Sequence, residues 1–341
     1  MNIVFTSNQL AERGTETALI DYAYANEEFS DNKSILAFPE NRIFDKNRYE
    51  TLSKHFEILL YKNSGDFNNQ LKTVNAGLVY AIVSGYHPDI TDEITACKTF
   101  VHCVFSLNRQ HGTYYVPIHP YLNNVFRKKY PVLPHIVHKK IDATAGKSNL
   151  REKLGIPVSA KVFGYYGGSS NFNIPFAQEA VLEIAENCPD IYFLFMNISD
   201  FTNQKNMKNI IFLPGSTDSN VKSAFIQACN AMIHARFDGE TFGLSVAEFS
   251  VMNKPVITYK ANCLIRLKNY LNRFRNRQPV YAEAHLMNLG NLAITYSNKK
   301  QLISEIKNFD DYYDKSKNYD CFSEKFSAEK VMEIFYDIIS K

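Results

Sequence analysis

The chain has 341 residues, a length that exceeds one ordinary hydrophobic core and predicts two domains. Its net charge is only +3, which excludes a dedicated nucleic-acid binder, because such binding depends on neutralising phosphates. No apolar run approaches the length of a transmembrane helix, and the first residues show no basic leader of a secretory signal. The six cysteines form no C-x-x-C pair, which indicates reduced thiols and a cytoplasmic protein.

The N-terminal half alternates strand-like and helical patterns. A helix is predicted over 15–29, and a second helix is predicted around the basic cluster Arg127, Lys128 and Lys129. This alternation is typical of βαβ units, whose strands form a parallel sheet. Short apolar runs predict strands at 2–6, 34–38, 55–61, 78–84, 99–104, 114–118 and 135–137.

The C-terminal half repeats the same alternation. Two such series in one chain predict an α/β protein with two doubly wound, Rossmann-like domains and right-handed crossovers. The predicted strands are 161–166, 191–197, 209–213, 231–235 and 255–259, and the predicted helices are 174–187, 221–229, 242–252, 264–274 and 327–339.

The domain boundary is predicted in the polar, small-residue segment 142–149. The first domain is then 1–145, and the second is 146–324. In open α/β sheets, ligands bind outside the carboxyl ends of the strands. The functional residues are therefore expected in the loops that follow the strands, facing a cleft between the domains.

One loop after a predicted strand carries two carboxylates beside a helix start. The helix begins near Gly243, so the amides of Gly243, Leu244 and Ser245 are free donors at a positive dipole end, which suits a diphosphate. Glu240 precedes the helix and Glu248 lies within it; a carboxylate there can accept hydrogen bonds from both hydroxyls of a ribose. The alternative interpretation is that Glu240 is a helix-start acid and Glu248 a solvated helix residue.

The segment Glu240-Thr-Phe-Gly-Leu-Ser-Val-Ala-Glu248 resembles the E-x-F-G-x-x-x-x-E signature of retaining glycosyltransferases of the GT-B fold, the family 4 group. Pro255-Val-Ile follows at the family's distance, with Lys254 in place of the usual glycine. The resemblance implies that Glu240 is catalytic and faces the donor sugar. It also implies that Glu248 holds the ribose, and that the amides of Gly243, Leu244 and Ser245 bind the donor diphosphate.

Further segments extend the resemblance along the chain. Arg13-Gly14-Thr15-Glu16 is similar to the family's G-G-x-E loop, which implies that Gly14 and Thr15 contact the donor. His102 ends a predicted strand as the family's catalytic histidine does, although a histidine there can also be a buried core residue, and His87 has a comparable claim. Residues 133–138 resemble the family's hinge, and the final helix, about 325–341, would pack back onto the first domain.

The loop after the first strand of the second domain departs from the family. It carries Gly168 and Ser169 where the family has an arginine and a lysine that clamp the pyrophosphate. Backbone amides and hydroxyls would bind phosphate there, with Arg236 or Lys254 supplying the missing positive charge. No metal-ligand pattern and no Asp-x-Asp motif are present, so a metal-independent enzyme with no cofactor is expected.

The interval between Glu248 and Glu283 contains no acidic residue and seven basic ones. It includes the basic amphipathic helix predicted over 264–274. This helix fits a peripheral contact with an anionic membrane surface, an acidic glycan or a phosphate, and it also fits an ordinary packed helix with a solvated basic face.

The resemblance implies transfer of a sugar from a nucleotide-diphosphate sugar, UDP- or GDP-linked, to a hydroxyl of a glycan or glycoconjugate acceptor, with retention. Two alternatives stay open: a nucleotide-sugar epimerase of the same fold, and a non-catalytic nucleotide-sugar-binding protein. The uncharged loop at Gly168 favours the latter. The sequence does not identify the sugar, the base, the acceptor or the oligomeric state.

Overall fold

The computed structural model describes residues 1–341 except 12–13, 44, 87, 139–149, 203–206 and 275–278. The chain forms two compact units. The first consists of Met1–Ile136, Arg273–Gln278 and Phe326–Lys341, and the second of Val137–Asn272 and Pro279–Lys325. The boundary predicted at 145/146 lies outside the described residues.

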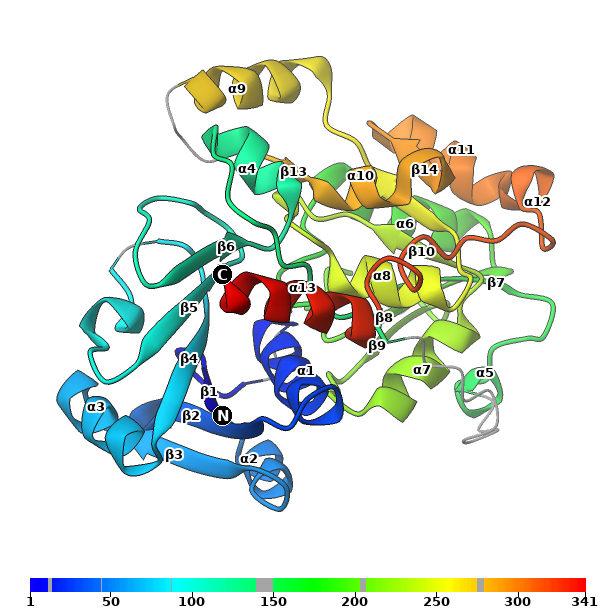
Figure 1. Ribbon diagram of the computed structural model, residues 1–341. Coiled ribbons are helices and arrows are strands. Elements are labelled where there is room, and N and C mark those ends of the chain that lie inside the picture. The colour runs from blue at the N-terminus through cyan, green and yellow to red at the C-terminus, as the bar shows by residue number, and fades with distance from the viewer. Residues whose placement is uncertain (12–13, 44, 87, 139–149, 203–206, 275–278) are drawn as a thin grey trace. The chain divides into compact units, whose positions relative to one another are not determined.

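The first unit is built on a parallel six-stranded sheet in the order β3-β2-β1-β4-β5-β6 (Figure 1). The strand order changes direction between β1 and β4, so the topological switch point of this doubly wound sheet lies between these two strands. The strands are nearly continuous apolar runs, as expected where helices cover both faces. Their bounds are β1 Asn2–Thr6, β2 Lys33–Pro39, β3 Glu57–Tyr61, β4 Ala76–Val83, β5 Lys98–Cys103 and β6 Tyr114–Pro117.

The final helix of the chain belongs to this first unit. On α13, the Phe335 ring lies 5.1 Å from that of Phe100 on β5, and the Tyr336 hydroxyl lies 3.2 Å from Oδ1 of Asn26 on α1. The helix therefore covers sheet residues that would otherwise be exposed. The helical segments of the unit are α1 Gly14–Glu28, η1 Glu40–Arg42, α2 Lys46–Leu52, α3 Ser64–Thr73, η2 Ile90–Glu93, α4 Pro120–Phe126 and α13 Ala328–Ser340.

The second unit repeats the same topology. Its parallel sheet has the order β14-β12-β10-β7-β8-β9, so its switch point lies between β7 and β10. The edge strand β14 carries no strong strand pattern and was not predicted. The bounds are β7 Lys161–Tyr166, β8 Ile191–Met196, β9 Ile210–Leu213, β10 Ala231–His234, β12 Val256–Tyr259 and β14 Ala293–Tyr296, with the short pair β11 Gly239–Glu240 and β13 Ala282–Glu283.

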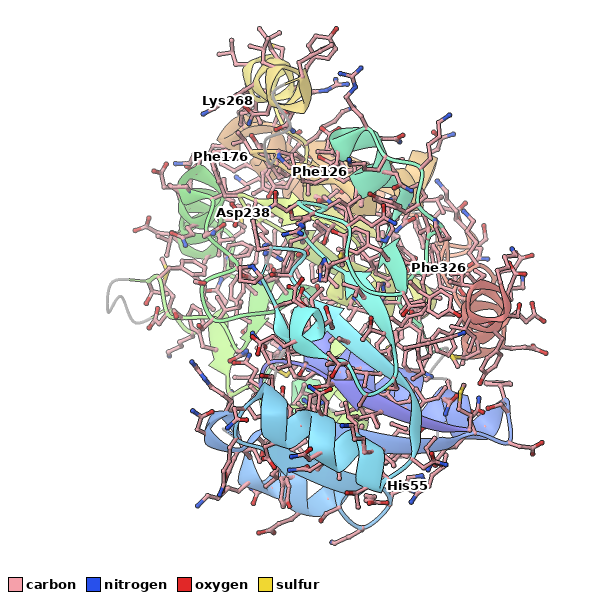
Figure 2. The ribbon with its side chains drawn as sticks, turned by 60° about the vertical axis from the view of Figure 1, so that its left-hand side comes forward. His55, Phe126, Phe176, Asp238, Lys268 and Phe326 are labelled. Atoms are coloured by element: carbon pink, nitrogen blue, oxygen red, sulfur yellow. The ribbon has the colours of Figure 1, made fainter. Side chains whose placement is uncertain are left out.

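Aromatic side chains join helices to this second sheet. Phe176 on α6 packs edgewise against Tyr259 and Tyr296, at the ends of β12 and β14 (Figure 2). The helical segments are α5 Leu150–Lys153, α6 Pro175–Asn187, α7 Ser219–Ala228, α8 Leu244–Val251, α9 Cys263–Phe274, α10 Ala284–Leu289, η3 Gly290–Leu292, α11 Lys299–Lys307 and α12 Phe309–Tyr312.

Two local predictions were wrong. Residues 135–137 form no strand; the sheet ends at β6, and nearby Leu133 makes a single backbone hydrogen bond to Pro117. The basic cluster Arg127–Lys129 follows α4 and is not part of it, because Arg127 adopts φ 55° and ends the helix in a left-handed cap. Among the described residues, no helix is both long and apolar enough to cross a bilayer.

Candidate functional site

The loops that follow β7 and β10 are fastened together at the switch point of the second sheet. Asn173, in the loop after β7, donates its backbone N–H to the Ala235 carbonyl at 3.0 Å. Its side-chain oxygen accepts the N–H of Phe237 at 2.7 Å. These two bonds fix the start of the loop that carries Arg236 and Glu240.

The same loop turns sharply at Gly239. This residue has φ 66°, and an added Cβ would lie 2.0 Å from the Ala282 carbonyl oxygen, so no side chain fits there. Gly239 and Glu240 pair with Ala282 and Glu283 as β11 and β13, and the Ala282 N–H donates to the Asp238 carbonyl at 2.7 Å. The backbone of Glu240 is therefore held from both sides.

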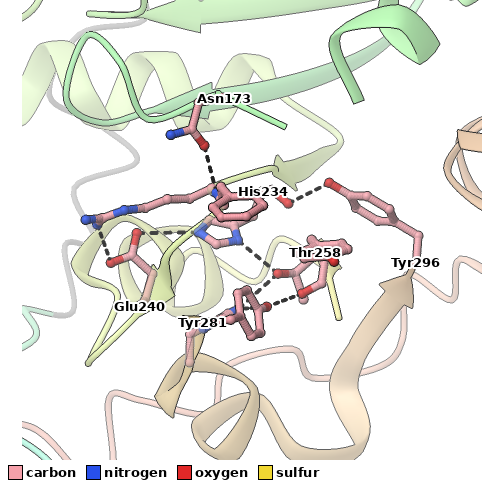
Figure 3. Close-up of polar contacts among 10 residues, drawn as sticks. Asn173, His234, Glu240, Thr258, Tyr281 and Tyr296 are labelled. Carbon is pink, nitrogen blue, oxygen red and sulfur yellow. Dashed lines mark hydrogen bonds and ion pairs between the residues drawn. The ribbon is translucent and has the colours of Figure 1, made fainter. Parts of the chain in front are cut away.

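Glu240 forms the charged centre of the site (Figure 3). Its Oε2 lies 2.9 Å from Nη1 of Arg236, and its Oε1 lies 3.4 Å from Nε2 of His234. Burial alone would raise the pKa of Glu240, but the charge of Arg236 and the His234 hydrogen bond outweigh it and lower that pKa to about 2. Burial likewise lowers the pKa of Arg236, yet the Glu240 carboxylate outweighs burial and raises it. Both groups are charged at neutral pH.

A buried chain of hydrogen bonds continues behind Glu240. The Thr258 hydroxyl lies 2.9 Å from Nδ1 of His234 and 3.1 Å from Nε2 of His285. An ionised carboxylate only accepts, so His234 donates to Glu240 from Nε2. Burial lowers the pKa of His285 to about 3, so that ring is neutral. The Thr258 hydroxyl thus links the two imidazole rings behind Glu240.

We expect Thr258→Val to lower the free energy of unfolding by about 2 kcal/mol, since the isosteric methyl leaves two buried ring nitrogens without their shared partner. Thr258→Ser, which keeps the hydroxyl, should stay close to the wild type. Urea denaturation of the two variants measures the difference, and equal midpoints would show that the hydroxyl bridge contributes nothing.

The helix after Glu240 begins without a side-chain cap. Gly243 is the N-cap residue, with φ 90° and ψ 68°, and its carbonyl accepts the first helical bond from Ala247 at 2.9 Å. Leu244 and Ser245 are half-buried at the first helical positions. Their amides, at the positive end of α8, are oriented to bind an anion. Gly243 is also closely packed, since an added Cβ would lie 3.2 Å from Cβ of His285.

Glu248 lies one turn further along α8 and has a different partner. Its Oε1 lies 2.6 Å from Nζ of Lys222 on α7, and that ammonium lies 5.6 Å from the ring centroid of Tyr166, at the carboxyl end of β7. Lys222 is therefore a cation beside the switch point, in a position that sequence reasoning missed. A small pocket opens here within the second unit, lined by His138, Ser219, Lys222, Ser223, Ile226, Glu248, Val251 and Met252.

The remaining predicted residues of the second unit differ in their surroundings. Gly168 and Ser169 form an exposed turn after β7, and the Ser169 carbonyl accepts the N–H of Ser199 at 2.9 Å. Lys254 cannot serve as the missing phosphate ligand. It precedes β12, at the amino edge of the sheet, and its Nζ donates to the carbonyl of Cys229 at 2.6 Å. Arg236 and Lys222 both lie at the carboxyl edge.

The other predicted residues belong to the first unit. Gly14 and Thr15 open α1, and His87 lies outside the described residues. His102 is the last but one residue of β5, and its side chain is fully buried, next to the Tyr80 hydroxyl and 5.8 Å from the ring of His135. Burial lowers the pKa of His102 to about 3, despite the opposing effect of the backbone at Leu133, so the ring is neutral.

Among the described residues, a single group has ligand atoms close enough to share a metal ion: Asp89, Asp92 and His111, in the first unit. Asp89 and Asp92 already accept backbone hydrogen bonds at the start of the short helix η2. Asp89 accepts the N–H of Thr91 and contacts Nε2 of His111 at 3.0 Å, and Asp92 accepts the N–H of Asp89. This arrangement is a capping box and gives no independent sign of a metal.

No known family model matches the sequence, and no curated protein matches it. Solved structures do match over the full chain. Anabaena Alr3699/HepE, crystallised in complex with UDP and glucose, is 15% identical to this chain and superposes with a TM-score of 0.75. The match covers 100% of both chains. A glycosyltransferase from Rickettsia africae shares 13% identity with a TM-score of 0.70, covering 100% of this chain and 99% of its own.

A third neighbour is WaaG, a glycosyltransferase involved in lipopolysaccharide biosynthesis, which is 11% identical to this chain with a TM-score of 0.59. The match covers 100% of this chain and 95% of the WaaG chain. At such low identity, these likenesses concern the fold. The two doubly wound parallel sheets with interleaved helices match the two Rossmann-like domains of these neighbours. The chain therefore has the GT-B fold, which confirms the predicted fold class.

Proposed function

We propose that the protein is a glycosyltransferase that moves a sugar from a UDP- or GDP-sugar to a hydroxyl of a glycan or glycoconjugate, with retention and without a metal or cofactor. The observation that carries the proposal is the half-buried, ionised Glu240 between Arg236 and His234, three residues before Gly243, the N-cap of α8. The Anabaena neighbour of the same fold, solved with UDP and glucose, supports a nucleotide-sugar donor.

The donor would be held by groups of the second unit. The amides of Leu244 and Ser245 bind the diphosphate at the positive end of α8, where its charge interacts favourably with the helix dipole. Gly168 and Ser169 add backbone and hydroxyl donors, and Arg236 and Lys222 supply the positive charge that the glycine loop lacks. The Glu248 carboxylate accepts hydrogen bonds from the ribose hydroxyls, and its ion pair with Lys222 holds the carboxylate in position.

The reaction forms a bond from the acceptor oxygen to the anomeric carbon and breaks the bond from that carbon to the diphosphate oxygen. The acceptor proton passes to a phosphate oxygen of the leaving diphosphate, on the same face of the sugar, which preserves the anomeric configuration. Glu240 contacts the donor sugar and positions it, while Arg236 and the α8 amides stabilise the charge that develops on the leaving group.

The first unit would supply Gly14 and Thr15 as further donor contacts and His102 as a catalytic residue. His102 serves there as a neutral donor or acceptor, since its ring does not protonate in the neutral range. All six cysteines are free, which fits a reducing compartment, and we place the protein in the cytoplasm.

Glu248→Gln is expected to weaken UDP or GDP binding by about tenfold to a hundredfold, because it removes a charged acceptor of ribose hydrogen bonds. Isothermal titration calorimetry with each nucleotide measures the loss. Glu186→Gln, an exposed glutamate on α6, is the matched control and should bind as the wild type does. If the two variants bind the nucleotides with equal affinity, Glu248 does not contact the donor.

A panel of UDP- and GDP-sugars tests the function itself. Free nucleoside diphosphate that forms only when an acceptor is added supports transfer. A changed sugar on an intact nucleotide identifies an epimerase, and tight binding without turnover across a broad set of acceptors identifies a binding protein. Either of these last two results overturns the proposal.

A further inference from the structure

Helix α9, Cys263–Phe274, exposes most of its apolar side chains, with Ile265 as the half-buried exception. Leu264, Leu267, Tyr270 and Leu271 are 72%, 55%, 57% and 47% exposed. At 3.6 residues per turn they fall within an arc of about 120°. We refer to these four residues as the apolar arc. Helices that pack on a protein core have the reverse arrangement, so ordinary packing does not explain this one.

The opposite side of α9 is polar and is attached to the unit. Asn269 donates to the Tyr281 carbonyl at 2.7 Å, and its side-chain oxygen accepts the N–H of Val280 at 2.7 Å. Asn269 and Ile265 are both half-buried, whereas the apolar arc is exposed. The attachment therefore fixes the helix with its apolar arc outward.

Positive charge flanks the apolar arc. Arg266 lies at one border of the arc and Lys268 at the other, and both are exposed (Figure 2 shows Lys268). The sequence from 249 to 282 contains no acidic residue that would offset them. Long basic side chains at the borders of an apolar helix face can extend to lipid headgroups while the apolar residues enter the acyl boundary.

We propose that α9 is an interfacial helix that attaches the protein to an anionic lipid bilayer. The apolar arc inserts at the boundary between headgroups and acyl chains, and Arg266 and Lys268 contact the phosphates. Because α9 follows β12, it leaves the sheet at the same carboxyl edge as the Glu240 loop. Attachment would therefore hold the candidate site next to the membrane surface and favour an acceptor that is itself carried on a lipid.

Sedimentation with vesicles tests the attachment on the full chain, without any nucleotide. The wild type should bind vesicles of phosphatidylcholine mixed with phosphatidylglycerol, and added salt should weaken this binding. The double variant Leu267→Glu/Leu271→Glu should bind about a hundredfold more weakly. The matched control is Val158→Glu/Val221→Glu, which places the same charges at exposed valines elsewhere in the second unit and should bind like the wild type.

The charge contribution has its own variants. Arg266→Gln/Lys268→Gln should weaken binding to the anionic vesicles by about thirtyfold. Lys300→Gln/Lys307→Gln removes two exposed charges from α11 and should leave binding unchanged.

The absence of tryptophan from the sequence allows a direct measurement of insertion. In Leu271→Trp, the new residue is the chain's sole tryptophan, and its emission should shift to the blue when anionic vesicles are added. Val158→Trp, at a 90% exposed position, should show no shift.

Three outcomes overturn the proposal. They are a wild type that stays with the supernatant, equal losses in the α9 variants and their controls, and an unchanged Leu271→Trp spectrum. Concentration-dependent dimerisation that depends on the apolar arc, without vesicle binding, would identify a second copy of the chain as the partner instead.

Discussion

Replacing Glu240 with glutamine is expected to reduce the rate of sugar transfer by about a hundredfold to a thousandfold. The substitution keeps the size of the side chain but removes the charge that Arg236 and His234 contact. Its amide also presents a donor where the site requires an acceptor. Initial rates of nucleotide release at saturating donor and acceptor measure the effect.

Asp238→Asn is the matched control, because it removes one carboxylate charge two residues away, at an exposed position of the same loop. It should transfer sugar at the wild-type rate. If Glu240→Gln also keeps the wild-type rate, Glu240 has no part in the reaction and the site assignment is lost.

Glu240→Gln should also change how the stability of the protein depends on pH in acid. Because the pKa of Glu240 is lowered to about 2 in the folded protein from its usual value of about 4.5, its charged form contributes stability above the unfolded pKa. That contribution is lost as the pH falls from about 4.5 through 2. Thermal unfolding measured across this range should show the loss in the wild type, and Glu240→Gln should lack it.

Gly239→Ala is expected to lower the free energy of unfolding by about 3–5 kcal/mol, near the upper end of the effects of single substitutions. The added Cβ meets the Ala282 carbonyl oxygen at 2.0 Å, where backbone and not a flexible side chain must move. The β11–β13 pair should separate, and donor binding should be lost with it. Urea denaturation and nucleotide titration measure the two effects.

Gly155→Ala provides a close control for this prediction. Gly155 has φ 66°, equal to that of Gly239, but an added Cβ there meets no atom within 4 Å. Its effect should be limited to the backbone strain of about 1–2 kcal/mol. If both variants lose the same stability, the close approach to Ala282 is not what requires glycine at position 239.

Most of the fold could be predicted because its strands are short, buried and apolar, and a parallel sheet leaves them few alternatives. The edge strand β14 was missed, because Ala293 and Thr295 reduce its apolar character and only part of it is buried. Arg127 was wrongly placed inside a helix, since a left-handed cap formed by arginine has no clear sequence signal.

The residues of the site divide in the same way. Glu240, Gly243 and Glu248 could be named as candidates because a local motif contains them. Lys222, Thr258 and His285 could not, because they reach the site from separate elements, α7, β12 and α10. Their contacts depend on strand order, which periodicity does not reveal. Lys254 shows the reverse error, since a residue near the motif in sequence lies at the other edge of the sheet.

Asn269 attaches α9 to Tyr281, and this attachment separates two kinds of change that the protein can accept. Substitutions in the apolar arc alter what α9 touches without altering the hydrogen bonds that Tyr281 makes with Asn269 and His285. The exposed side chains of α9 can therefore be substituted together while the helix stays attached through Asn269. A variant that keeps Asn269 could therefore carry a different outer surface on α9 and retain the hydrogen bonds of Tyr281.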